Sequence, residues 1–140
     1  MQKILVPVDG SENALRALRH AIVVANSSAQ AELHLLYVQN PIPPHLHLNF
    51  PIDSIKKAEA KEADKVLLAA RQLCDQAAVS CVAHIRVGAI AQTIAAGADE
   101  LQCDAIIMGT RGMNAVASLI IGSVTTKVIH LAQVPVTLVK

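Results

Sequence analysis

Short apolar segments alternate with amphipathic ones along the chain. The first apolar segment, residues 3–8, stops at the turn-forming residues Asp9, Gly10 and Ser11. From residue 14, apolar side chains recur at spacings of three and four, at Leu15, Leu18, Ile22 and Ala25. The first pattern is typical of a strand and the second of a helix with one buried face. The opening of the chain therefore predicts a strand followed by a helix.

The same alternation continues through the rest of the sequence. Further strands are expected at residues 32–38, 80–87, 105–108 and 135–139, and further helices at 53–77, 90–101 and 120–131. Alternating strands and helices form a parallel sheet through right-handed crossovers, with helices on both faces. The 80–87 strand alternates apolar and polar residues, so we expect it nearer a sheet edge. The pattern predicts one α/β domain over residues 1–140, with a doubly wound, five-stranded parallel sheet.

One connection is expected to be irregular. Residues 39–52 contain Pro41, Pro43, Pro44 and Pro51. Proline removes a backbone donor and fixes φ, so this stretch fits neither a helix nor a strand. Asp53 and Ser54 follow it, and short polar side chains of this kind cap helix N-termini. We therefore expect an irregular segment followed by a long helix that Asp53 and Ser54 cap.

Composition excludes several classes of function. The net charge is +1 and the only aromatic side chains are Tyr37 and Phe50, so the chain lacks the field and the stacking platform that nucleic acids require. No apolar run approaches the roughly 20 residues that span a bilayer, and the N-terminus lacks the features of a signal peptide. Cys74, Cys81 and Cys103 are expected to be packing residues. We therefore expect a cytoplasmic protein that binds neither nucleic acid nor membrane.

Two turns carry the candidate chemistry. One contains Asp9 and follows the first strand, and the other begins at Gly109 and follows the fourth. In doubly wound sheets, ligands bind beyond the carboxyl ends of strands whose connections leave toward opposite faces. Glycine lets a backbone approach a phosphate closely, and a helix N-terminus offers unpaired N–H groups. These two turns therefore predict a site for a phosphate-bearing ligand.

The polar side chains of these turns suit a nucleotide. Arg111 adds a charged donor, and Ser123 and Thr125 add hydroxyl donors. Asp9 could accept hydrogen bonds from ribose hydroxyls or from an adenine amino group. The sequence has neither the P-loop nor the Gly-x-Gly-x-x-Gly fingerprint, and two glycines three residues apart also occur in purely architectural turns. A second Gly-Ser, Gly122 with Ser123, favours the binding interpretation.

Other candidate groups have plainer interpretations. Ser11 stands where a helix begins, so we expect a cap rather than a nucleophile. His45 and His47 lie two residues apart, but no Cys, Asp or Glu accompanies them. The remaining histidines are expected at the surface or in packing. We therefore assign no catalytic residue and no metal site of the protein itself.

These motifs resemble those of the universal stress protein family. The likeness covers essentially the whole chain, with the signatures at residues 4–12, 104–112 and 122–136. In the ATP-binding branch of that family the loop reads Gly, two residues, Gly, nine residues, Gly, then Ser or Thr. This chain satisfies that pattern at Gly109, Gly112, Gly122 and Ser123. The resemblance implies the strand order 3-2-1-4-5 and a homodimer joined through the last strand, from Val134 to Val139.

The resemblance also implies a role for each site residue. The residues that would line the adenine and ribose pocket are Pro7, Val8, Asp9 and Val38, with Met108 and Gly109 as its floor. Those that would surround the phosphates are Arg111, Gly112, Gly122, Ser123, Val124 and Thr125. The implied ligand is ATP, or AMP or ADP, with Mg²⁺ held only through the nucleotide. The sequence departs from the family at Val8, where many relatives carry Thr, and at the apolar residues 115–117, where relatives often have a basic residue.

Three functions remain open at this point. The first is a regulatory, ATP-binding dimer involved in the stress response. The second is a dimeric interaction module of the same fold that does not use nucleotide. The third is an enzyme, either a slow or partner-dependent ATPase or an adenylyl-transferring protein, although the chain has no Walker lysine and no carboxylate pair for magnesium.

Overall fold

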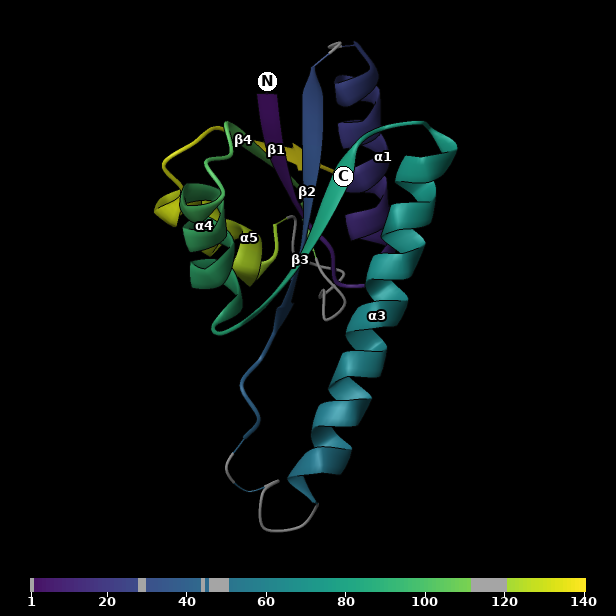
Figure 1. The fold of residues 1–140 in the computed structure, drawn as a ribbon. Helices are drawn as coiled ribbons and strands as arrows, with labels where there is room; N and C mark the ends of the chain where they lie inside the picture. The colour runs from purple at the N-terminus through teal and green to yellow at the C-terminus, as the bar shows by residue number, and fades with distance from the viewer. Residues whose placement is uncertain (1, 28–29, 44, 46–50, 112–120) are drawn as a thin grey trace.

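The computed structural model describes residues 2–27, 30–43, 45, 51–111 and 121–140. Within them, strands and helices alternate as the hydrophobic pattern predicts (Figure 1). The elements are β1 (Gln2–Pro7), α1 (Glu12–Ser27), β2 (Ala31–Gln39), α3 (Ile52–Gln76), β3 (Cys81–Val87), α4 (Ile90–Glu100), β4 (Ala105–Gly109), α5 (Ser123–Leu131) and β5 (Val136–Val139). No helix in these residues is long and apolar enough to cross a bilayer.

The strands form one sheet in the order β3-β2-β1-β4-β5, and every pairing is parallel. Leu5 of the central strand pairs with His34 on one side and Ile106 on the other. This confirms the doubly wound sheet and the strand order that the family resemblance implied. It also confirms that β3 lies at an edge, where it pairs with β2 alone among the described strands.

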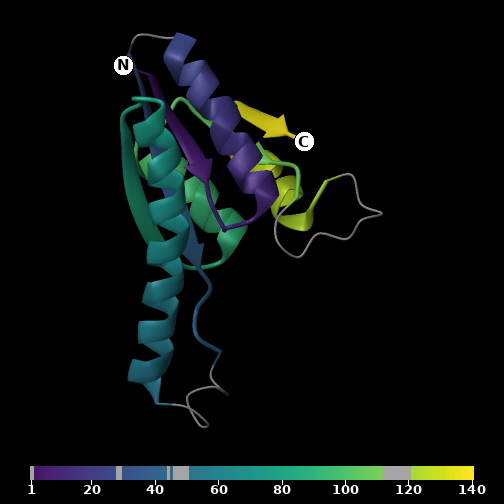
Figure 2. The ribbon, with the colours of Figure 1, turned by 90° about the vertical axis from the view of Figure 1, so that its right-hand side faces the viewer.

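Two helical layers cover the sheet. Helices α1 and α3 pack on one face, and α4 and α5 on the other (Figures 1 and 2). Successive strand residues point to opposite faces, so Ile4 belongs to the core under α1 and α3, and Leu5 to the core under α4 and α5. Leu18 of α1 and Ile94 of α4 are among the helical residues that close these two cores.

The start of α3 corrects one prediction. The cap residue is Pro51, whose carbonyl accepts hydrogen bonds from the N–H groups of Ser54 and Ile55, and no side chain caps the helix. Proline has the fixed φ that suits the entry to a helix, so the helix begins before Asp53 and Ser54 and not after them. Asp53 lies in the first turn, where its charge favours the helix dipole.

The first turns of α3 extend past the carboxyl ends of the strands (Figure 1). Their side chains are mostly exposed, and Ala63 is the first fully buried residue of this helix. Between β2 and α3, residues 40–43, 45 and 51 form neither helix nor strand, which confirms the expected irregular connection for that part of the segment.

Candidate functional site

A cleft lies where the chain changes direction across the sheet. After β1 the chain crosses to α1 on one face, and after the neighbouring β4 it crosses to α5 on the other. Ligands of doubly wound sheets bind at such a point. Here a cleft of about 310 Å³ opens between the ends of β1, β2 and β4 and the starts of α4 and α5.

The structure brings the predicted site residues together. Those that line the cleft are Pro7, Val8, Asp9, Val38, Met108, Gly109, Arg111, Gly122, Ser123, Val124 and Thr125. Gly112 and residues 115–117 lie outside the described residues. Segments more than 100 residues apart in sequence therefore form one surface, because β1 and β4 are adjacent strands.

The turn after β1 is held by side-chain hydrogen bonds within the turn. Oδ1 of Asp9 accepts a hydrogen bond from the Ser11 N–H at 2.9 Å, and Oγ of Ser11 accepts one from the Ala14 N–H at 3.1 Å. Gly10 between them has φ +86°, which glycine adopts without strain. The second bond confirms that Ser11 is the cap of α1. Since no described residue donates to Oδ2, Asp9 keeps one carboxylate oxygen for a ligand.

The start of α5 is tied to the end of β4 through backbone groups. The Gly122 N–H donates to the Thr110 carbonyl at 2.7 Å, and the Thr110 N–H donates to the carbonyl of Val139 in β5 at 3.0 Å. Gly122 is the N-cap residue, and no side chain caps the helix. The first N–H groups of a helix have no partner within it, so those of Ser123 and Val124, which line the cleft, are available donors with no partner among the described residues.

Thr125 differs from the prediction that it supplies a hydroxyl to phosphate. Its side chain is buried, and its hydroxyl donates to the Gly109 carbonyl at 3.0 Å. A buried carbonyl at the end of a strand needs a donor, and Thr125 provides it. The hydroxyl therefore fixes α5 against β4, and Ser123 is the hydroxyl donor of this turn that stays exposed.

Arg111 carries an unsatisfied donor. Its Nε is buried and has no hydrogen-bond partner within the part of the chain that the structure describes. A buried donor without a partner costs about 1–3 kcal/mol, so such groups are rare unless a ligand satisfies them. A guanidinium forms strong, directional hydrogen bonds with phosphate. Arg111 and the uncapped start of α5 therefore fit an anionic group in the cleft.

Gly109, which lines the cleft, also has a packing role. A Cβ at this position would lie 3.0 Å from both Cβ and the carbonyl oxygen of Asn13, so glycine here lets α1 pack against the end of β4. At Gly122 a Cβ would lie 3.4 Å from its nearest neighbours, which is ordinary contact. Packing within the protein thus explains Gly109 but does not require Gly122.

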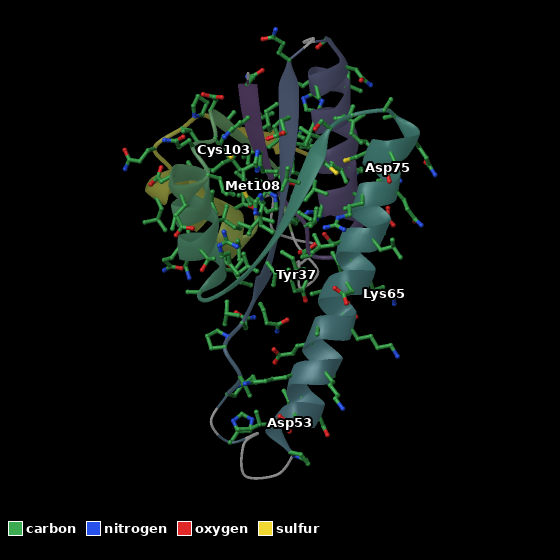
Figure 3. All side chains as sticks on the ribbon, in the orientation of Figure 1. Tyr37, Asp53, Lys65, Asp75, Cys103 and Met108 are labelled. Carbon is green, nitrogen blue, oxygen red and sulfur yellow. The ribbon has the colours of Figure 1, made fainter. Side chains whose placement is uncertain are left out.

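Sequence reasoning named Val38 of β2 but missed several other residues that line the cleft. Tyr37, Asn40, Ile90 and Ile94 line it, together with the cap Ser11. Figure 3 shows Tyr37 near the lower end of the sheet on the α3 side and Met108 on the α4 side. The signal that could have found Tyr37 is its place at the end of the strand next to β1.

The Tyr37 phenol is held in its neutral form. Burial raises the pKa of Tyr37, and the carboxylates of Glu62, Glu59 and Asp9 raise it further. The hydroxyl lies 3.4 Å from Oε1 of Gln39, to which it donates. Tyr37 therefore presents an uncharged hydrogen-bonding group beside Asp9.

Comparison with known proteins agrees with this geometry. The model of the universal stress protein family matches residues 1–140. The chain belongs to the universal stress protein family. It is 34% identical over 140 residues to the universal stress protein in the QAH/OAS sulfhydrylase 3′ region of Thermus aquaticus, covering 98% of this chain and 97% of that one.

Solved structures show the same fold. The universal stress protein UspA from Lactobacillus plantarum superposes with a TM-score of 0.86 at 28% identity, over 99% of this chain and 97% of that one. A universal stress protein in complex with cAMP gives a TM-score of 0.77 at 25% identity, over 99% and 97% of the two chains. The cleft of this universal stress protein is thus built on a fold that carries an adenine nucleotide in a relative.

Proposed function

We propose that this universal stress protein binds ATP in the cleft between β1 and β4 and acts as a regulatory nucleotide-binding protein. The observation that carries the proposal is the buried Nε of Arg111, which has no partner among the described residues, beside the uncapped start of α5, with Asp9 in the same cleft. Cationic and N–H donors suit phosphates, and a carboxylate suits the hydroxyls of a ribose.

The two ends of the cleft suit the two ends of a nucleotide. Pro7, Val38 and Met108 give an apolar wall for adenine, and Asp9 offers Oδ2 to the ribose or the amino group. The Val8 side chain is 3% exposed and belongs to the core under α1 and α3, so its contribution to the cleft comes from the backbone and does not depend on a hydroxyl.

The phosphates would lie at the other end, against Arg111, Ser123 and the first N–H groups of α5. Gly109 and Thr125 hold the strand end and helix start in place, and Gly112 and Gly122 complete the glycine pattern. When ATP is bound, Mg²⁺ would enter with the triphosphate, neutralise part of its charge, and take no ligand from the protein. AMP and ADP use the same apolar wall with fewer phosphate contacts.

Dimerisation through the last strand is the second part of the proposal. β5 pairs only with β4 among the described strands, so its outer edge has free backbone groups. Ile129 and Leu131 of α5 are each 43% exposed and add apolar surface that a partner could cover. A second copy that meets the segment from Val134 to Val139 would cover both features. We place this role in the cytoplasmic stress response, as the name of the family suggests.

Calorimetric titration of the purified protein with ATP and Mg²⁺ tests nucleotide binding directly. Arg111→Gln should weaken binding about 10- to 100-fold, because a hydrogen bond to a charged group contributes about 1.5–3 kcal/mol. Arg19→Gln is the matched control, since Arg19 is exposed on α1 and lies outside the cleft. If no heat is seen at millimolar ATP, the proposal fails and the interaction module that does not use nucleotide is favoured. Release of phosphate by the protein alone would favour the ATPase.

A further inference from the structure

A partly buried chain of three polar side chains joins β2 to the edge strand β3, away from the cleft. Nε2 of His34 lies 2.7 Å from Oε1 of Glu32, and Nδ1 of His34 lies 2.9 Å from Nε2 of His84. The two rings are within 10° of parallel, with centroids 5.1 Å apart. His34 is only 5% exposed, so water cannot easily replace these partners.

This geometry limits the protons that the two rings can hold. Nε2 of His34 meets a carboxylate, so it carries a proton and donates to Glu32. The contact between the rings then needs one proton between Nδ1 of His34 and Nε2 of His84. A single added proton preserves that contact, because one ring can still donate and the other accept. A second added proton puts an N–H on both facing nitrogens, and the rings must move apart.

The charges around the pair come from all the elements packed on this side of the sheet. Glu32 lies beside His34, and Lys3 of β1 is in register with Glu32. Arg86 follows on β3 and lies 3.7 Å from the Glu100 carboxylate at the end of α4. Each of these two carboxylates thus has a basic residue near it.

Two further groups complete the surroundings. Oδ2 of Asp104 accepts a hydrogen bond from the backbone N–H of Lys3, and burial raises the pKa of the Cys103 thiol to about 11, so that thiol stays neutral. Burial lowers the pKa of His84 below its ordinary value of 6.5, and the charges of His34 and Arg86 lower it further. The Glu32 carboxylate acts in the opposite direction.

We propose that His34 and His84 make the β2–β3 contact sensitive to acid: protonation of both rings breaks their hydrogen bond and loosens the edge strand. The backbone ladder between β2 and β3 remains, but β3 pairs with β2 alone among the described strands, so no described strand supports it on its other side. β3 also leads through Gly88 into α4, whose Ile90 and Ile94 line the cleft. Acid therefore loosens the support of one cleft wall.

The sign of the effect follows from proton binding. The folded protein holds fewer protons on His84 than the unfolded chain does, because the folded pKa is the lower one. The stability that depends on a neutral His84 is therefore fully present above pH 6.5 and is lost as the pH falls through the folded pKa of His84. The ring contact itself breaks only with the second proton.

Thermal unfolding of the full chain between pH 7.5 and pH 5 tests the proposal. In His84→Gln the amide can donate to or accept from Nδ1 of His34 and does not titrate. We expect the melting temperature of the wild type to fall by about 3 °C more than that of His84→Gln over this range. His20→Gln, which removes an exposed histidine of α1, should follow the wild type. Equal pH dependence in wild type and His84→Gln would overturn the proposal.

Amide hydrogen exchange on the wild type keeps the test independent of the variant. Between pH 7.5 and pH 5, protection factors in β3 should fall about tenfold relative to those in β4, which lies on the other side of β1. Protection in β3 that falls no more than in β4 would contradict the proposal, whether or not His84→Gln folds.

Discussion

The two strand-to-helix turns at the cleft differ in how their polar groups are paired. After β1, Asp9 and Ser11 accept hydrogen bonds from backbone N–H groups, and α1 begins with a side-chain cap. After β4, Arg111 Nε has no partner among the described residues and α5 begins without a side-chain cap. The first turn pairs its helix cap within the protein and leaves one carboxylate oxygen of Asp9 open, whereas the second has donors that no described residue satisfies. A ligand site is thus marked more clearly by what the fold leaves unpaired than by the glycines themselves.

Gly122→Asp should abolish the difference between the turns and have the largest effect. Its backbone has the extended φ and ψ of a cap residue, and a Cβ fits there, so Asp can cap α5 as Ser11 caps α1. The new carboxylate would take an N–H group and repel phosphate, weakening ATP binding by about 100-fold, or roughly 3 kcal/mol. Calorimetry measures the loss, and Gly122→Ser, a cap without charge, should lose less. Equal affinity in Gly122→Asp and wild type would show that phosphates do not lie here.

Gly109→Ala tests the place where the two turns touch. The added methyl group meets the Asn13 backbone of α1 at 3.0 Å, so α1 must move away from β4. We expect a loss of about 2 kcal/mol in the free energy of unfolding, measured by urea denaturation without nucleotide. Gly122→Ala is the matched control and should change stability by less than about 0.5 kcal/mol. Similar losses in both variants would mean that Gly109 has no special packing role.

Ser11→Ala should have the smallest effect of these substitutions, and it tests the turn after β1. Loss of the α1 cap should lower the free energy of unfolding by about 1 kcal/mol. Ser27→Ala, at the exposed end of the same helix, should have a much smaller effect. Urea denaturation of the two variants checks this, and ATP affinity should change less in Ser11→Ala than in Arg111→Gln. If Ser11→Ala were as stable as Ser27→Ala, the Ser11 hydroxyl would not stabilise the start of α1.

Much of this fold could be predicted because its signals are local. Buried parallel strands are continuously apolar and each helix has one apolar face, so the element order followed from periodicity. The cleft followed from the rule that ligands bind where neighbouring strands send their connections to opposite faces, and from the family resemblance, which supplied the strand order. The predicted cap of α3 was wrong because Pro51 and the polar pair after it, Asp53 and Ser54, both favour a helix start. The local sequence does not show which of them begins the helix.

The missed features depend on contacts between distant residues. The hydroxyl of Thr125 meets the carbonyl of Gly109, 16 residues earlier, so its structural role appears only when α5 is packed against β4. The need for glycine at position 109 comes from the approach of Asn13 in α1. Likewise, His34 and His84 are 50 residues apart and meet only because β2 and β3 pair in one particular register.

The first turns of α3 give this molecule an end that can unfold on its own. They extend past the sheet, and a helix without packing depends on its own weak propensity. Those turns should open and close many times without the rest of the domain unfolding, while the same helix from Ala63 onward stays fixed in the core. Because Lys56, Lys57 and Lys61 are exposed there, trypsin should cut this end first and leave the sheet intact.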